Sequence, residues 1–437
     1  MFYISDYKSY IRQNNIKFIR PVFVDILGRM LDFTIPVEKF DDFIANGAGF
    51  DGSSIEGFAR TEESDLRFVP DLKTFIALPW EYEGVHENWR EAIVFGTIED
   101  SKGRAYEGDT RYFLKKVIEQ YLDIGAPKFG AELEFFVFSD RGAPHPIDNG
   151  GYFRSGLYGE IRKEAALLLN KMNINIGSDH HEVAPSQHEI NLEYTDALTM
   201  ADRIIVAKYI IKKMARKYGL YASFMPKPIK NVNGNGMHVH ISLWKNDENI
   251  FYDSTTKSLS QTARFYIGGL LHYAKDIQAA LNQWINSYKR LQPDYEAPTY
   301  ITWGYHDRGA YIRIPDAKTP QSTRIELRSP DPACNPYLAF ALIHIAGIAG
   351  IEEELEPPDP FDLDPAEFSG VSLPPPKTAR LSPTLGAALH HFKHSTLIKG
   401  ALPPHIYNNF IQNKELECLE FNKTITNYEI KKYYPIL

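Results

Sequence analysis

The stretch Gly130–Phe138 reads GAELEFFVF and places two glutamates, Glu132 and Glu134, directly before a run of aromatic residues. Such a run is typical of a buried strand. Side chains two residues apart on a strand point to the same face, so both carboxylates project together while Leu133 points to the opposite face. Burying two carboxylates this close is costly unless a cation lies between them. The alternative for this pair alone is a half-exposed strand whose glutamates face water.

The same spacing of ionisable residues recurs in other predicted strands. The segment GNGMHVHISLW contains His238 and His240, and HHEVAPSQHEINLEY contains Glu182 and Glu189 on either side of a Pro-Ser turn. A third segment, RIELRSPDP, alternates charged with apolar side chains and contributes Arg324, Glu326 and Arg328. A single histidine pair is more often structural than metal-binding. Several strands with ionisable residues on one face are better explained by a shared ligand, because burying them all without one is costly.

The donor atoms indicate which ligand this is. Five glutamates and one or two histidines form an oxygen-rich set, which suits Mg²⁺ or Mn²⁺ and argues against structural zinc. This set contains more carboxylates than a single ion needs, so we expect two or more ions. Metal ions together with several arginines are what phosphoryl transfer requires, because its transition state spreads negative charge over oxygens. These arginines are Arg290, Arg308, Arg313, Arg324 and Arg328.

The bulk properties of the 437-residue chain exclude several classes of protein. Its net charge of −8 and scattered acidic residues argue against a nucleic-acid partner. The two cysteines, Cys334 and Cys418, form no disulfide or zinc motif, which suits a reducing compartment. The longest apolar stretch, residues 337–351, is shorter than the roughly 20 residues that span a membrane. We therefore expect a cytoplasmic protein with no membrane partner.

The order of elements predicts an α+β fold in two parts. Residues 17–35 are typical of a hairpin that turns at Leu27–Arg29, and a helix over 37–46 and a strand over 91–99 complete a small unit, residues 1–100. A boundary follows in residues 101–110, and the second domain spans 106–437. There we expect a mixed or antiparallel sheet, with strands at 129–138, 187–194, 236–243, 310–315 and 323–329 and helices at 156–172, 196–218, 259–280 and 334–351.

The motifs, taken in chain order, resemble those of glutamine synthetase in its class I, bacterial and archaeal form. They cover nearly the whole chain and read FDGSSIEGF (50–58), FGAELEFFVF (129–138), HHEVAPSQHEI (180–190), NGNGMHVHISLW (233–244), NSYKRLQPDYEAP (286–298), DRGAYIRIP (307–315) and RIELRSPDPACNPYLAFAL (324–342). The resemblance implies an N-terminal β-grasp domain and a catalytic domain with a curved, largely antiparallel sheet flanked by helices. It also implies a homo-oligomer, a dodecamer of two six-membered rings, whose sites form between neighbouring subunits.

The resemblance further implies a reaction and a set of metal ligands. Ammonia is joined to L-glutamate with ATP as co-substrate, giving L-glutamine, ADP and phosphate through a γ-glutamyl phosphate. One ion would be held by Glu134, Glu182 and Glu189 and would orient glutamate. A second ion, which bridges the ATP phosphates, would be held by Glu132, His238 and Glu326.

The remaining roles are carried over from the matching motifs. Arg290, Arg308 and Arg328 would bind the glutamate carboxylates, and Gly234 would let the backbone approach the substrate. Arg313 and Arg324 would stabilise the transferred phosphoryl group and ATP, with His240 and Ser242 near the nucleotide. Glu296 would close the site and take a proton from ammonium, which Asp51 of an adjacent subunit would bind. Arg60 would mediate feedback inhibition, and a P-II-type protein is a possible regulator.

One departure from the family pattern and two rival functions remain open at this point. The acidic motif reads Pro185-Ser186 where the family has Pro-Gly, which puts the fine positioning of the substrate in question. The first rival is a ligase that joins glutamate to a polyamine or ethanolamine; such relatives tend to alter the ammonium pocket, whereas Asp51 and Glu296 both match. The second rival is a non-catalytic family member, which should have lost metal ligands.

Overall fold

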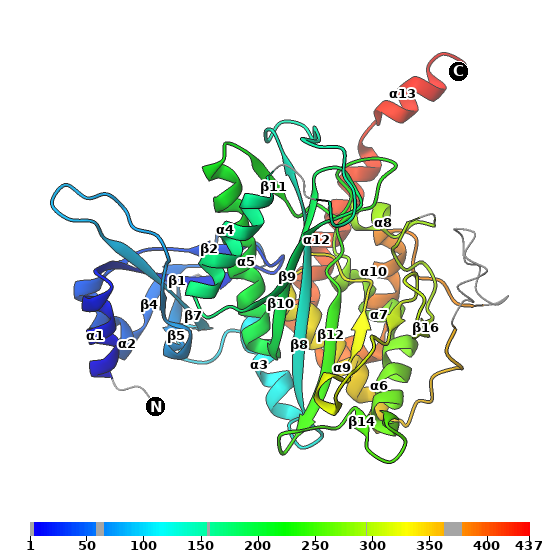
Figure 1. Cartoon of the computed structure of the whole chain (residues 1–437), viewed down its shortest axis with the longest axis horizontal. Helices are drawn as coiled ribbons and strands as arrows, with labels where there is room; N and C mark the ends of the chain where they lie inside the picture. The colour runs from blue at the N-terminus through cyan, green and yellow to red at the C-terminus, as the bar shows by residue number, and fades with distance from the viewer. Residues whose placement is uncertain (1–3, 58–64, 155–157, 294, 362–377) are drawn as a thin grey trace.

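The first part of the chain forms a mixed sheet with the strand order β2-β1-β7-β5-β4, shown in blue in Figure 1. In the computed structural model, which describes residues 4–57, 65–154, 158–293, 295–361 and 378–437, β1 and β7 are the parallel pair. Two short strands pair with them as well, β3 with β1 and β6 with β7. The strands are β1 (Ile16–Val24), β2 (Met30–Asp32), β3 (Ile35–Pro36), β4 (Ala48–Asp51), β5 (Asp65–Pro70), β6 (Ile76–Ala77) and β7 (Arg90–Glu99).

The predicted hairpin over residues 17–35 is confirmed by the pairing of β1 with β2. Asp25 accepts hydrogen bonds from the backbone N–H groups of Leu27 and Arg29, and Gly28 between them has φ 75°. A side chain on Gly28 would lie 2.5 Å from the Cα of Asn335, so the turn packs directly against the second part of the chain. The helices α1 (Ile4–Gln13) and α2 (Phe40–Asn46) accompany this sheet.

The second part is built on a larger, curved sheet with the order β16-β17-β18-β12-β8-β10-β9, in which every pair except β16 with β17 is antiparallel. Figure 1 shows its longest strand, β8, near the middle of the molecule. Two strands pair at its sides, β11 with β8 and β13 with β12. The bounds are β8 (Ala126–Phe138), β9 (Ile176–His181), β10 (Gln187–Asp196), β11 (Tyr221–Ser223), β12 (Val239–Lys245), β13 (Glu248–Asn249), β16 (Trp303–Gly304), β17 (Ile312–Arg313) and β18 (Ile325–Leu327).

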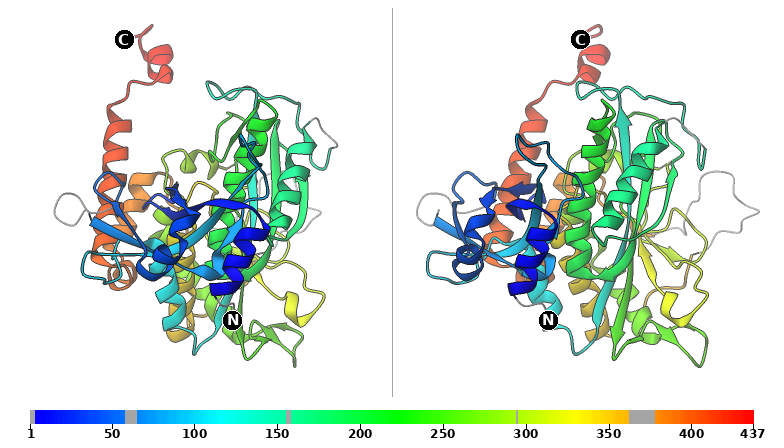
Figure 2. Two further views of the ribbon diagram at one scale, coloured as in Figure 1. Left: turned by 90° about the vertical axis from the view of Figure 1, so that its left-hand side faces the viewer. Right: turned by 60° about the vertical axis from the view of Figure 1, so that its left-hand side comes forward.

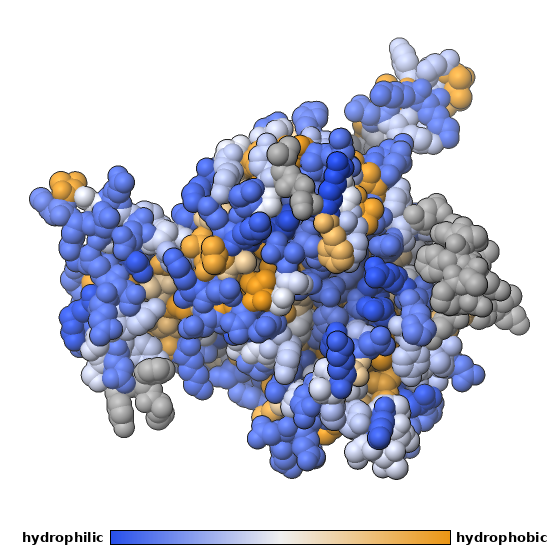
Figure 3. All heavy atoms as spheres, in the orientation of Figure 1, coloured by the Kyte–Doolittle hydropathy of each residue, from blue (hydrophilic) through white to orange (hydrophobic). Residues whose placement is uncertain are grey.

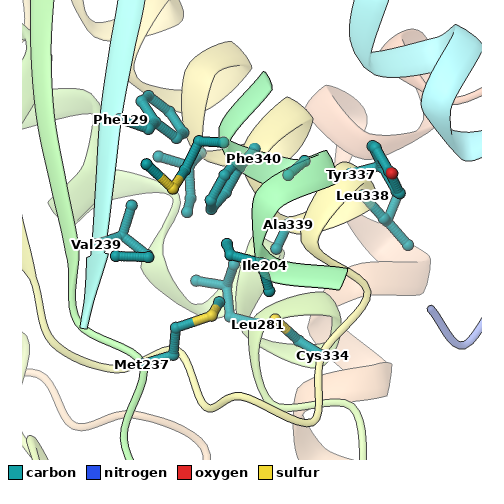
Figure 4. Packing of buried hydrophobic residues seen from close by; sticks show 14 of the residues in the cluster. Phe129, Ile204, Met237, Val239, Leu281, Cys334, Tyr337, Leu338, Ala339 and Phe340 are labelled. Atoms are coloured by element: carbon teal, nitrogen blue, oxygen red, sulfur yellow. The ribbon is translucent and has the colours of Figure 1, made fainter. Parts of the chain in front are cut away.

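Helices cover the face of this sheet that lies opposite Glu132 and Glu134. The odd-numbered residues of β8 enter the main core, where the Phe129 ring meets Phe340 edge-on at 4.6 Å (Figure 4). The helices are α3 (Thr110–Gln120), α4 (Gly159–Lys171), α5 (Ala197–Lys217), α6 (Gln261–His272), α7 (Ala274–Leu281), α8 (Ser287–Arg290), α9 (Pro336–Glu352), α10 (Leu385–His394), α11 (Thr396–Ala401) and α12 (Pro404–Lys423). The β-grasp and catalytic architecture is thus confirmed, and the predicted helix 259–280 divides at Tyr273 into α6 and α7.

Buried polar contacts join the two parts of the chain. Asn335 donates to the carbonyl oxygen of Ile26 and to the Thr110 hydroxyl, both at 3.1 Å, and Gln283 donates to the carbonyl oxygen of Leu27. The Arg111 guanidinium on α3 pairs with Asp71 of the first part at 3.2 Å and with Asp202 on α5 at 2.9 Å. These contacts hold the N-terminal sheet beside the catalytic sheet, as the two views of Figure 2 show.

The C-terminal segment extends away from the rest of the molecule. Its helix α13 (Asn427–Tyr433) projects from the end of α12 in Figures 1 and 2. Several of its apolar side chains are exposed, and Figure 3 shows apolar residues at its tip above an otherwise largely hydrophilic face. Among the described residues, no helix is both long and apolar enough to cross a membrane.

Candidate active site

One face of β8 presents four residues in a row at every second position: Lys128, Gly130, Glu132 and Glu134. The neighbouring strands continue this pattern across the sheet, because residues paired in register share a face. Glu134 pairs with Glu189 on β10, which pairs with His180 on β9. A second row of paired residues runs the other way across the sheet. Gly130 on β8 pairs with His240 on β12, His240 pairs with Glu326 on β18, and Glu326 pairs with Arg313 on β17. The predicted ionisable strands therefore meet on one surface.

This surface forms the floor of a cavity of about 340 Å³. The cavity gathers all six predicted metal ligands, four of them on the strands β8, β10 and β18. It also gathers the predicted substrate residues and the predicted base. The predicted residues that line it are Glu132, Glu134, Glu182, Glu189, His238 and Glu326, with Gly234, Arg290, Glu296, Arg308, Arg313 and Arg328.

The first group of candidate ligands, here the His238 cluster, consists of Glu132, His238 and Glu326. Their donor atoms lie within 4.8 Å of one another, and His238 Nδ1 is 2.9 Å from Glu132 and 3.6 Å from Glu326. Burial alone would raise the pKa of Glu326, but the charges of Arg328, His240 and His238 lower that pKa to about 2. Burial likewise opposes ionisation of Glu132, yet His240 and His238 lower its pKa well below the usual range. Both carboxylates of this cluster therefore stay ionised.

The second group, here the Glu189 cluster, consists of Glu134, Glu182 and Glu189 beside His180. His180 Nε2 lies 2.8 Å from Glu182 and 3.8 Å from Glu189. Burial, followed by the charge of Glu182, raises the pKa of Glu134 to about 8. Burial and the charges of Glu132, Glu134 and Glu182 raise the pKa of Glu189 well above its usual value. The carboxylates of this cluster repel one another.

The donor set of the two clusters fits divalent cations. Two groups of donor atoms, those of Glu132, His238 and Glu326 and those of His180, Glu182 and Glu189, each lie within 4.8 Å of one another and are rich in the oxygen ligands that suit Mg²⁺ and Mn²⁺. A cation would remove the repulsion that raises the pKa values of Glu134 and Glu189. Within the described residues, the buried side-chain oxygen Oε1 of Gln187, whose amide donates to Glu134, has no hydrogen-bond partner.

The arginines of the cavity differ in how many of their donors are already used. Arg290 is buried and donates to the carbonyl oxygens of Arg328, Ser329 and Pro330, so it mainly holds that segment in place. Arg328 pairs with Glu326, while its buried Nε has no partner among the described residues. Arg313 donates to Glu326 at 2.7 Å, and Arg308 lies exposed at the cavity edge. Donors of Arg308 and Arg328 remain to meet a carboxylate.

Two glycines, Gly234 and Gly236, stand at positions where a side chain would collide with neighbouring atoms. A Cβ on Gly234 would lie 2.3 Å from the Pro226 carbonyl oxygen, so no other residue fits there. A Cβ on Gly236 would lie 2.6 Å from Nη2 of Arg290 and 3.2 Å from Glu134. The Gly236 N–H instead donates to the Glu134 carboxylate at 2.9 Å. The backbone itself therefore forms this wall.

Other predicted residues lie beside the cavity or away from it. His240 bonds to Glu132 at 2.8 Å, and Arg324 donates to His240 at 3.3 Å, so both extend the His238 cluster outward. Ser242 is one row further along β12, opposite Lys128. Asp51 is exposed on β4 and accepts a hydrogen bond from the Ser53 N–H at 2.8 Å, and it does not line the cavity. Arg60 lies outside the described residues.

The structure brings in residues that the sequence prediction did not select. His180 stands two positions before Glu182 on β9, so the alternation that identified the other ligands could also have identified it. Tyr152 and Phe153 line the cavity from a loop whose sequence has no periodic signal. A neighbouring hollow of about 780 Å³ is lined by Lys128, Glu193, Tyr194, Thr195 and Asp196. It lies at the Lys128 end of the same sheet face.

The chain matches two family models along most of its length. Residues 15–98 match the glutamine synthetase β-grasp domain, and residues 107–433 match the glutamine synthetase catalytic domain. Glutamine synthetases of Thermotoga maritima and Methanosarcina mazei are 42% and 40% identical to this chain, covering 98% of it and 99% and 96% of their own lengths. The solved Plasmodium falciparum glutamine synthetase superposes with a TM-score of 0.88 at 28% identity, and a GmaS–ADP complex with 0.87 at 29%, covering 99% and 98% of this chain and 99% of each of those chains. This chain is a member of the glutamine synthetase family.

Proposed function

We propose that the cavity joins ammonia to the γ-carboxylate of L-glutamate in two displacement steps. A γ-carboxylate oxygen attacks the γ-phosphorus of ATP, the bond to ADP breaks, and γ-glutamyl phosphate forms. Ammonia then attacks the γ-carbonyl carbon, phosphate leaves with the carbon–oxygen bond electrons, and the nitrogen loses a proton to give L-glutamine. The chain is accordingly a glutamate–ammonia ligase. The observation that carries the proposal is the meeting of six carboxylate and imidazole ligands with four arginines in one cavity.

Divalent ions are part of this chemistry, and the two clusters are their proposed sites. The Glu189 cluster would hold one ion and the His238 cluster the other, with Mg²⁺ or Mn²⁺ both suited to the ligands. When bound, such ions neutralise negative charge on the phosphates and the attacking carboxylate. Glu132 and Glu134 act from one strand, so each contributes a ligand to a different ion.

The substrate glutamate is proposed to lie against the Gly234 wall, between the Glu189 cluster and the free arginine donors. Arg308 and Arg328, which both line the cavity, would bind its carboxylates, since guanidinium donors match carboxylate geometry. Arg290 supports them by fixing the backbone of residues 328–330. Arg313, which donates to Glu326, would stabilise the moving phosphoryl group.

The nucleotide is proposed to run along the face of β8 from Glu132 towards Lys128. Gly130 leaves the strip open, because a Cβ there would only touch Tyr194 and His240, at 3.5 and 3.6 Å. The phosphates would lie near His240 and Arg324, Ser242 would contact the nucleotide further along, and the base would stack on the exposed Tyr194 ring. Tyr194→Ala should raise KM for ATP about tenfold while Tyr194→Phe stays near wild type. Equal KM values in both variants would place the base elsewhere.

The ammonium pocket is proposed to combine Glu296 with Asp51 from a neighbouring subunit. Glu296 lines the cavity, whereas Asp51 does not reach the cavity of its own chain. The family relationship supports a homo-oligomer, and we propose two stacked six-membered rings. The exposed apolar side chains of the C-terminal segment supply surface for subunit contacts; they are Ile425, Tyr428, Ile430, Tyr434 and Ile436. Mixed oligomers of Asp51→Ala and Glu296→Ala subunits should regain activity only if the two residues act across an interface.

Five further assignments accompany this proposal. We propose a division into domains at 1–100 and 106–437, the class I form, and a cytoplasmic location, which the unpaired cysteines Cys334 and Cys418 support. Feedback inhibition through Arg60 and control by a P-II-type protein remain sequence-based proposals. A solution mass measurement and a glutamine titration of an Arg60→Ala variant address the ring number and the inhibition.

The deciding experiment measures phosphate release from ATP with Mg²⁺ and L-glutamate, comparing ammonium with a panel of amines. We expect the fastest release with ammonium, formation of glutamine, and loss of both in Asp51→Ala. Release only with a larger amine would replace ammonia as the substrate. No release from correctly assembled protein with any amine would overturn the proposed activity.

A further inference from the structure

A third buried polar cluster lies behind the cavity and consists of Asp148, His181 and His188. Its donor atoms lie within 4.8 Å of one another, as do those of Glu132, His238 and Glu326 at one proposed metal site and those of His180, Glu182 and Glu189 at the other. However, the Arg162 guanidinium contacts His188 Nδ1 directly and also pairs with Asp179 at 2.8 Å. The positively charged guanidinium of Arg162 therefore already lies on the side of the cluster where a metal ion would have to bind. This cluster is a network of internal hydrogen bonds and not a third metal site.

Asp148 is the centre of this network and joins a loop to two strands. One of its carboxylate oxygens accepts hydrogen bonds from the backbone N–H groups of Ser186 at 2.7 Å and Gly150 at 2.8 Å. The other oxygen lies 3.0 Å from His181 Nε2 at the end of β9. The side chain is almost fully shielded, so solvent cannot easily replace these bonds. Asp148 thus clamps the turn between β9 and β10.

The clamped turn contains a strained residue. Ser186 is fully buried and has φ 63°, a backbone conformation that costs about 1 kcal/mol or more for a residue other than glycine. Its hydroxyl oxygen accepts a hydrogen bond from the Ile147 N–H at 2.6 Å. The Asp148 loop therefore holds Ser186 through both its backbone and its side chain. Such a conformation persists only where surrounding contacts enforce it.

The clamp connects directly to the Glu189 cluster. His181 Nδ1 donates to the carbonyl oxygen of Glu182 at 2.6 Å, and the Glu182 N–H donates to the Gln187 carbonyl oxygen at 2.8 Å. The Gln187 side chain in turn donates to the Glu134 carboxylate at 2.9 Å. Moving the turn would therefore shift two of the three carboxylates of this cluster. None of these bonds involves the His238 cluster.

We propose that Asp148 is a positioning residue that sets the affinity of the Glu189 cluster for its divalent ion. It acts through His181 and Ser186 on the backbone of Glu182 and on Gln187, and it touches neither the ion nor the substrate. The inference rests on the proposed metal role of the Glu189 cluster. Residues of this kind behind a metal site commonly change its affinity about 10- to 100-fold when they are removed.

The test is calorimetric titration of the assembled, substrate-free protein with Mn²⁺. Asp148→Ala should weaken binding at one site about tenfold and leave the second site unchanged. Asp148→Asn should stay close to wild type, because its amide oxygen can accept the same two N–H groups and its amide nitrogen can donate to His181. The matched control is Asp140→Ala in the same loop. Asp140 also accepts two backbone N–H groups, those of Gly142 and Ala143, but has no contact with the turn, so its loss should not change binding.

Melting temperature separates positioning from general support. An Asp148→Ala protein that melts earlier but binds both ions as tightly as wild type would overturn the proposal. So would Asp148→Asn binding as weakly as Asp148→Ala. If Asp148→Ala does not assemble, Ser186→Ala decides, since it removes only the acceptor for Ile147; wild-type affinity there would overturn the proposal. A wild-type protein that binds no Mn²⁺ would instead overturn the proposed metal function itself.

Discussion

The His238 cluster and the Glu189 cluster share one strand, one cavity and nearly the same ligand types, yet their charges are balanced differently. Around Glu326 and Glu132, the charges of Arg328, His240 and His238 outweigh burial and lower both pKa values. Around Glu134 and Glu189, burial and the charges of neighbouring carboxylates dominate and raise both pKa values. The chain therefore supplies enough positive charge around the first cluster and too little around the second. Only the Glu189 cluster depends on an added ion to be stable with all its carboxylates ionised.

The largest expected effect is on activity, where the two clusters should behave alike. Glu134→Gln and Glu326→Gln each remove one charged ligand with almost no change of shape. We expect each to lower kcat/KM at least about 1000-fold, since either ion contributes several kcal/mol to the transition state. Steady-state assays at saturating Mg²⁺ check this. Retention of more than a tenth of wild-type activity in either variant would remove that residue from the ligand set.

The next effect separates the clusters, because Glu326→Gln should destabilise the metal-free protein. It leaves the buried guanidinium of Arg328, and Arg313 beside it, without their charged partner. Breaking a buried ion pair by removing one member costs about 3 kcal/mol or more. Urea unfolding in the presence of EDTA at pH 7 should show the loss. An unchanged midpoint would mean that the His238 cluster is not balanced by its arginines.

The same substitution in the other cluster should have the opposite sign. Glu134→Gln removes a buried carboxyl whose charge is disfavoured, so the metal-free protein should gain roughly 1–3 kcal/mol at pH 8, given that one pKa unit corresponds to about 1.4 kcal/mol. The gain should disappear when Mn²⁺ is added, because only the wild type then binds the ion fully. A destabilised Glu134→Gln protein in EDTA would contradict the assigned imbalance.

The smallest effect is the pH dependence of the metal-free protein. The pKa of Glu134 is raised from 4.5 to about 8, so its contribution to stability is full below pH 4.5 and is lost as the pH rises through 8. The pKa of Glu326 is lowered from 4.5 to about 2, so its contribution is present above pH 4.5 and is lost as the pH falls towards 2. Unfolding midpoints measured with EDTA from pH 5 to 9 should fall towards alkaline pH.

The matched measurement with bound Mn²⁺ should show a flatter profile over the same range. Binding should also release protons at neutral pH, because Glu134 and Glu189 must lose theirs to coordinate an ion. Calorimetry in buffers of different ionisation enthalpy measures that release. Identical profiles with and without the ion would show that the carboxylates of the Glu189 cluster are already ionised.

The metal ligands could be predicted from alternating positions along strands. Features that depend on contacts between residues far apart in the sequence could not be predicted. The pairs Glu132/Glu134 and His238/His240 can be read from spacing alone, because a strand has a period of two. His180 fits the same rule, and the pairing of β9 with β10 places it opposite Glu189. The burial of Arg290 against three carbonyl oxygens could not be anticipated, since it depends on how α8 packs against residues 328–330.

The same limit explains two features of the fold and the site. The helical pattern over residues 259–280 contains no proline, so nothing local predicted the break at Tyr273, whose hydroxyl bonds to Glu353 directly after the C-terminal end of α9. The difference in charge balance between the clusters was equally hidden, because it arises from which arginines approach from β17 and β18. The domain limits and the role of Asp51 remain predictions.

The row Lys128, Gly130, Glu132, Glu134 on β8 has a consequence for how this protein can change over generations. Positions two residues apart on a strand are separated by about 7 Å. The covalent backbone therefore fixes the distances between the proposed nucleotide strip and the two ion sites. A substitution along this row changes one side chain and leaves the spacing of the others intact. A single inserted or deleted residue between 128 and 134, however, would turn every later side chain to the opposite face. Length variation should therefore be confined to the surrounding loops, while this seven-residue segment keeps its length in any functional descendant.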